Sequence, residues 1–110
     1  MTQSDCRRAV IRREGLRQSL LDGLLQLGQL HFADAHYAAA AEVYQRVLSF
    51  DPYLEMGHRE LMRCHARRGE TGRAVRQYQA LRDMLKQELR AEPSTETVLL
   101  YERLRRGDSV

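Results

Sequence analysis

The 110-residue sequence predicts an all-α protein built from antiparallel helical pairs. Residues that favour helices (Leu, Ala, Arg, Gln and Glu) dominate, whereas β-branched residues are few and only two prolines are present. The second observation is an internal repeat with a period of 34 residues. The repeated positions are Ala40 and Ala74, Tyr44 and Tyr78, and Val47 and Leu81. The third is the length, which suffices for one domain of four or five packed helices.

A period of 34 residues is that of a tetratricopeptide repeat (TPR), a unit of two antiparallel helices. We expect one TPR-like domain over residues 1–110, an α-α superhelix of about five helices with units at 21–54 and 55–88 and a flanking helix at 95–105. Small residues let the paired backbones approach, and a tyrosine fills the space beside them. The structural signature residues are Leu24, Gly28, Ala40, Tyr44, Pro52, His58, Ala74, Tyr78 and Pro93.

The periodicity predicts helices over residues 5–32, 36–49, 52–68, 71–90 and 95–105. The first helix carries an apolar stripe, formed by Leu16, Leu20, Leu24 and Leu27. We expect Asp51 to cap the third helix, with Pro52 at its first position, and Ser94 to cap the last. The second unit differs from the first because Met62 replaces the small glycine and no proline ends the unit, so its second helix is expected to run to about Arg90.

Two segments resemble a narrower family than TPR proteins in general. Residues 51–62 read D-P-x-x-E-x-x-H-R-x-L-M, and residues 69–97 follow G-x4-A-x3-Y-x3-R-x2-L-x2-E-L-x2-E-P-S-x-E-T. Both are similar to the bacterial transcriptional activator domain of SARP-type antibiotic regulatory proteins, and the resemblance covers residues 7–105, as the C-terminal part of that domain. Arg90 stands where the family usually has glycine, which predicts a longer helix there.

The resemblance implies a TPR-like domain that follows a winged-helix DNA-binding domain and contributes to activation through protein contacts. Neither the winged helix nor the first helical pair of the activation domain is in the sequence. The chain is therefore either a fragment or a short stand-alone relative, and DNA recognition is not carried over to its residues.

An arginine stripe is the candidate partner-binding site. Arg59, Arg63 and Arg67 lie four residues apart on the first helix of the second unit, the helix that usually lines the concave groove of a TPR. Guanidinium groups suit carboxylates and phosphates, so the stripe could hold an acidic peptide or a polymerase surface. The alternative is pairing with Glu55 or Glu60 on the same helix, and the HR pair favours a structural or interface role for Arg59.

Other clusters support less. His58 and His65 lie two turns apart beside Cys64, but further ligands are lacking, so we expect packed histidines, no metal and no cofactor. The basic run Arg7, Arg8, Arg12, Arg13 and Arg17 has no interleaved aromatics, and a solvated face or docking surface is favoured over nucleic-acid contact. Val10, Ile11 and Leu16 on the same helix favour docking.

The sequence favours an interaction protein over an enzyme. It contains no glycine-rich phosphate loop, no H-E-x-x-H and no Ser-His-Asp arrangement. The cysteines Cys6 and Cys64 match no disulfide framework, and signal peptide and membrane span are absent, which predicts a cytoplasmic protein. We expect protein partners, such as RNA polymerase or a DNA-binding domain in the same polypeptide, no direct DNA binding, no membrane binding, and self-association through open repeat ends. The alternative is a stand-alone TPR adaptor that binds a peptide.

Overall fold

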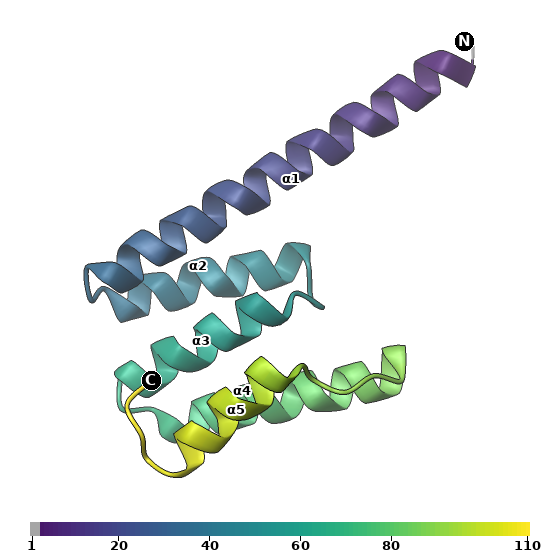
Figure 1. Cartoon of the computed structure of the whole chain (residues 1–110). Coiled ribbons are helices and arrows are strands. Elements are labelled where there is room, and N and C mark those ends of the chain that lie inside the picture. The colour runs from purple at the N-terminus through teal and green to yellow at the C-terminus, as the bar shows by residue number, and fades with distance from the viewer. Residues whose placement is uncertain (1–2) are drawn as a thin grey trace.

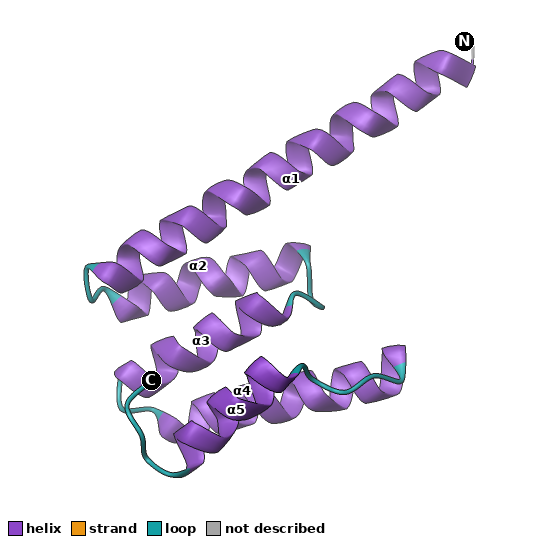
Figure 2. Cartoon of the chain, in the orientation of Figure 1, coloured by secondary structure: helices purple, strands orange, loops and turns teal. Residues whose placement is uncertain are grey.

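The computed structural model describes the backbone of residues 3–110 and the side chains of residues 12–110. Five α-helices follow one another, and a π-helical turn extends the fourth (Figure 1). The elements are α1 (Gln3–Ala33), α2 (Tyr37–Phe50), α3 (Glu55–Arg67), α4 (Thr71–Met84), η1 (Leu85–Leu89) and α5 (Thr95–Arg105). Residues 3–110 contain no strand (Figure 2). The predicted all-α class, with helices packed in antiparallel pairs, is therefore confirmed.

The helices form a stack in which each packs on the next, and α5 also packs on α3. The 31 residues of α1 exceed the 14 of α2, so α1 extends far past the end of its neighbour (Figure 1). The radius of gyration of 16.4 Å is accordingly larger than the roughly 13 Å of a compact domain of this length. The extended shape leaves a long face of α1 without a packed neighbour in the described part of the chain.

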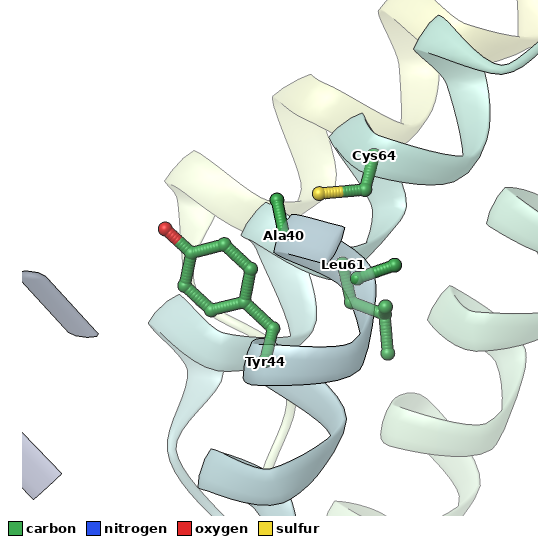
Figure 3. Close-up of a cluster of buried hydrophobic side chains, with 5 residues drawn as sticks. Ala40, Tyr44, Leu61 and Cys64 are labelled. Atoms are coloured by element: carbon green, nitrogen blue, oxygen red, sulfur yellow. The ribbon is translucent and has the colours of Figure 1, made fainter. Parts of the chain in front are cut away.

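The first core cluster lies between α1, α2 and α3 (Figure 3). It consists of the buried residues Ala40, Ala41, Tyr44, Leu61 and Cys64, with Leu25, Phe32 and Leu48 packed against them. Gly28 makes this packing possible, because a Cβ atom there would lie 2.7 Å from Cζ of Tyr44. The close approach of α1 to α2 therefore depends on glycine at this position.

The second core cluster joins α3, α4 and α5. It consists of Met62, Ala74, Tyr78, Leu100 and Leu104, and Tyr101 and Ala66 pack against it. The rings of Tyr78 and Tyr101 stack with centroids 3.9 Å apart. The flanking helix α5 is thus an integral part of the core of the second helical pair.

The predicted start of the third helix is wrong. α3 begins at Glu55 with Leu54 as its N-cap, whereas Asp51 is the C-cap of α2. Residues 51–54 form a turn closed by the Leu54 N–H, which donates to the Asp51 carbonyl at 3.3 Å, and Pro52 occupies the second position of that turn. The fixed φ of proline favours this position of a turn as well as the first position of a helix, and the turn prevails here.

The stripe of leucines predicted on the first helix is not the face that packs on α2. Leu25 and Phe32 pack against the first core cluster, Gly28 lies against Tyr44, and Leu21 is buried on the same side of α1. At about 100° per residue this face lies roughly 130° around the helix from Leu16, Leu20 and Leu27. Only Leu24 of the predicted stripe is half-buried, since it lies at the border of the two faces.

The longer helix predicted at Arg90 is also not found. Arg90 adopts a left-handed conformation (φ 48°), and its N–H and that of Ala91 both donate to the Leu85 carbonyl. This turn ends the helix where the family usually has glycine, the residue that adopts a left-handed conformation most easily. The arginine is therefore accommodated in the glycine conformation, and the helix is not extended.

Candidate functional site

A polar junction between α3 and α5 unites the two sequence segments that carry the family resemblance. The Glu55 carboxylate accepts hydrogen bonds from the Ser94 N–H (3.0 Å), the Ser94 hydroxyl (3.0 Å) and the Thr97 hydroxyl (2.6 Å). Arg59 donates to Oγ1 of Thr97 at 3.0 Å. Ser94 also caps α5 as predicted, because its Oγ accepts from the Thr97 N–H.

The charge of Glu55 is stabilised within this junction. Burial raises the pKa of its carboxyl group, but the hydrogen bonds from Thr97 and Ser94 and the charge of Arg59 outweigh burial, and the net pKa is lowered. Thr97 is fully buried, so its hydroxyl depends on these partners. The junction therefore fixes the position of α5 on α3 and is a structural feature.

The three arginines of the predicted stripe contact residues of their own chain. Arg59 lies in the α3–α5 junction, with only 13% of its side chain exposed, and also pairs with Glu96 at 3.5 Å. Arg63 pairs with Glu60 on the same helix. Arg67 is exposed, and its guanidinium lies over the rings of Phe32 (5.5 Å) and Tyr37 (5.8 Å). The stripe is thus divided among three different environments, and Arg67 is its most exposed member.

His58 links the α2–α3 turn to α4. Its Nε2 lies 2.8 Å from the Pro52 carbonyl, and its Nδ1 lies 2.8 Å from Nε2 of Gln77. A carbonyl can only accept, so Nε2 must donate and Nδ1 must accept from the Gln77 amide, which requires the neutral ring. Burial lowers the pKa of His58 and favours the same form. His58 is accordingly a hydrogen-bonded core residue.

His65 and Cys64 are buried side by side near the end of α3. Nδ1 of His65 has no hydrogen-bond partner within the described residues and lies 3.8 Å from the Glu70 carboxylate. Burial is the main cause that lowers the pKa of His65 and that raises the pKa of the Cys64 thiol, the latter to about 11. No group of three or more potential metal ligands occurs among the described residues.

An apolar ridge lies exposed on α1. Its four leucines, which we call the α1 ridge, are 41–64% exposed: Leu16, Leu20, Leu27 and Leu30. Arg12, Arg13 and Arg17 are exposed on the same helix, and Arg17 donates to the Phe50 carbonyl. The side chains of Cys6, Arg7, Arg8, Val10 and Ile11, to which the sequence analysis also referred, lie outside the described residues. None of the helices in the described part of the chain is both long and apolar enough to span a membrane.

Small hollows on the surface of residues 12–110 include the following three. The first, of about 150 Å³, lies beside the α1 ridge and is lined by Leu24, Leu27, Glu42, Val43 and Arg46. The second, of about 230 Å³, lies where α2, α3 and α4 meet. The third, of about 240 Å³, lies between α3, the first residue of α4 and the C-terminal segment 107–110. All three are smaller than the pockets that enclose small-molecule ligands.

Sequence reasoning identified the two segments of the junction but not their contact. The signal was present, because Glu55 and Arg59 in one segment and Ser94 and Thr97 in the other have complementary hydrogen-bonding groups. The outward direction of the α1 ridge was missed, although the spacing of Leu21, Leu25, Gly28 and Phe32 is an equally good helical stripe. Pro93 is buried beside the junction, whereas Pro52 is exposed in the turn.

Comparison with known proteins agrees with the resemblance seen in the sequence. A protein-family model described as the bacterial transcriptional activator domain matches residues 2–105. Searches of curated proteins and of solved structures found no match.

Proposed function

The chain belongs to the bacterial transcriptional activator domain family, and from this premise we propose that it is a protein-contact domain acting in transcription. Its partner would be RNA polymerase, another subunit or a DNA-binding domain, and its place of action the cytoplasm. The family is a regulatory domain family, which agrees with a chain whose polar clusters serve packing and capping.

The α1 ridge is the observation that supports this function best. Burial of exposed leucine side chains is favourable by roughly 1.5–3 kcal/mol each, and an apolar stripe along a helix is a common docking surface for another helix. The opposite face of α1 already packs on α2, so the ridge can be covered without disturbing the core. The basic residues Arg12 and Arg13 on the same helix would favour a partner that carries acidic groups.

Direct DNA binding is not part of this proposal. The net charge of +3 is small, and the arginines of the stripe have partners of their own in Glu60, Glu96 and Thr97. Arg67, which is exposed and forms no ion pair within the described residues, remains the best candidate of the stripe for a contact with a protein partner.

Substitution of the ridge tests the proposal. We expect Leu20→Glu, in the protein encoded by the native gene, to abolish most activation of a promoter reporter. The melting temperature of the purified chain should not change, because Leu20 is 47% exposed. Gln29→Glu is the matched control, since it adds the same charge to an exposed position on the other side of α1. Full activation by Leu20→Glu, at normal protein level, would refute a role of the ridge in partner contact.

A further inference from the structure

The hollow between α2, α3 and α4 has an unusual lining. Five residues form it: Gln45, His65, Arg73, Arg76 and Gln77. No carboxylate is among them, whereas every one carries at least one N–H group that can donate. His65 is 3% exposed and forms the floor, and the two arginines and Gln45 are exposed at the rim. The hollow therefore presents hydrogen-bond donors to whatever enters it.

The local charge is positive. Arg73 donates to Glu70 at 2.8 Å, and the same carboxylate lies 3.5 Å from Arg68. Arg76 forms no ion pair with any described residue. Three guanidinium groups thus accompany a single carboxylate, which leaves a positive excess at the rim, with Arg76 free to pair with an incoming anion.

The buried side chain of His65 has a polar atom without a hydrogen-bond partner. Nδ1 of His65 is one of two buried side-chain polar atoms that have no hydrogen-bond partner within the described residues. The nearest acid, Glu70, lies at 3.8 Å, which is beyond hydrogen-bond distance. Gln77 is held beside it because its amide donates to His58. Nδ1 is itself buried and its nearest charged neighbour, Glu70, is not part of the lining, so the donors within reach of a ligand are those of Gln45, Arg73, Arg76 and Gln77.

The size and the donors together specify the ligand class. About 230 Å³ is too small for a nucleotide or a drug-sized ligand, but it admits one carboxylate group. The planar fork of arginine matches a carboxylate with two parallel hydrogen bonds. The glutamine amides can hold the adjoining peptide, because each both donates and accepts.

We propose that this hollow binds the carboxylate of a Glu or Asp side chain in a peptide segment of the protein partner. The inference deepens the proposed function and rests on it, because that function supplies the partner. It specifies a second contact surface, formed by α2, α3 and α4, that is separate from the α1 ridge.

Calorimetric titration of the purified chain with a peptide of eight glutamates, capped at both ends, tests the site. We expect binding that Arg76→Gln weakens about tenfold, the usual effect of losing one charged hydrogen-bonded contact. Arg105→Gln is the matched control: it removes the same charge from an exposed position on α5, which contributes no residue to the hollow, and should weaken binding less than twofold at equal salt. The imidazole resonances of His65 should shift on addition of the peptide.

Three results would overturn the site. The first is that the wild-type chain fails to bind the peptide. The second is that the two variants weaken binding equally, which indicates attraction by net charge alone. The third is that inorganic phosphate shifts the His65 resonances while the peptide does not, which indicates a small-anion site. None of these results affects the reporter test of Leu20→Glu. A failure of the hollow and a failure of the protein-contact function are thus distinguishable.

Discussion

The two helical pairs solve the same packing problem with different residues. In the first pair Gly28 leaves room for the ring of Tyr44, which is completely buried between α1 and α2. The position 34 residues later holds Met62, which is itself completely buried. Tyr78, the counterpart of Tyr44, therefore lies toward α5 and stacks on Tyr101.

This difference shows how a repeat can lose its signature glycine and remain folded. The first pair is closed by direct approach of two backbones, so its stability depends on the fit of one ring against one glycine. The second pair is closed by a third helix, which contributes apolar residues and the polar junction at Glu55. We conclude that α5 is required by the second pair, whereas the first pair is completed by α3.

Removal of the Tyr44 ring should have the largest effect. Tyr44→Ala is expected to cost about 3–5 kcal/mol, because it leaves a closed cavity between α1 and α2. Tyr78→Ala should cost about 2–3 kcal/mol, since Tyr78 lies nearer the surface and its site can relax. Chemical denaturation of both variants measures the difference. A larger loss for Tyr78→Ala would reverse the comparison of the two pairs.

Tyr44→Phe separates the ring from its hydroxyl. The Tyr44 hydroxyl is buried and has no hydrogen-bond partner among the described residues, and burial raises its pKa to about 12. This substitution should leave the free energy of unfolding unchanged or raise it slightly, because it removes an unpaired polar atom. It serves as the control that the loss in Tyr44→Ala comes from packing.

Glu55→Gln tests the dependence of the second pair on α5. We expect a loss of about 2–3 kcal/mol at neutral pH, because three donors lose their charged acceptor. The lowered pKa of Glu55 means that its stabilisation is present above the ordinary value of 4.5 and is lost as the pH falls through the folded-state pKa. The two proteins should therefore approach each other in stability under acid conditions. An equal gap at all pH values would exclude the carboxylate charge as the cause.

Gly28→Ala tests whether close approach is special to the first pair. The added Cβ would lie 2.7 Å from the Tyr44 ring, and we expect a cost of about 1–3 kcal/mol. Gly23→Ala is the matched control on the same helix, because no atom lies within 4 Å of its added Cβ. The control should stabilise the protein by up to about 1 kcal/mol through helix propensity. Thermal unfolding measures the difference, and an equal fall in the melting temperature of both variants would contradict the role given to Gly28.

The smallest effect is expected at the left-handed residues. Ala35 (φ 61°) ends the turn within the first pair, and Arg90 (φ 48°) ends the helix of the second. Arg90→Gly and Ala35→Gly should each stabilise by about 0.5 kcal/mol, because glycine adopts this conformation without strain but loses more chain entropy. Arg90→Ala should give no such gain. Denaturation midpoints of the three variants check this, and destabilisation by Arg90→Gly would indicate that the arginine side chain itself supports the turn.

The number and type of helices followed from the sequence, because repeat period and apolar spacing reflect the packing of neighbouring helices. The Ser94 cap was equally predictable, since it depends on residues three positions apart. Local patterns could not determine which of two leucine stripes on α1 faces α2, because that choice depends on the partner helix. The turn at Pro52 was ambiguous for a related reason, as proline suits both a turn and a helix start.

The candidate site was less predictable than the fold. Spacing placed Arg59, Arg63 and Arg67 on one helix face. Their environments, however, depend on Glu60 of the same helix and on residues of three other helices, which are Thr97, Phe32 and Tyr37. The hollow around His65 combines residues from three helices. Such a set becomes visible only once tertiary contacts are known.

Because Cys64 is buried, the rate of its chemical labelling measures how often the first core cluster opens. The thiol is completely buried and its pKa is raised to about 11. While the core is closed, an alkylating reagent at neutral pH therefore cannot reach the sulfur atom, and the sulfur is protonated and unreactive. Modification of Cys64 therefore requires separation of α3 from α2, and its rate, followed by mass spectrometry of the labelled fragment, reports how frequently the first core cluster opens under native conditions. A partner that covers the α1 ridge and stabilises the packing of α1 on α2 would slow this labelling.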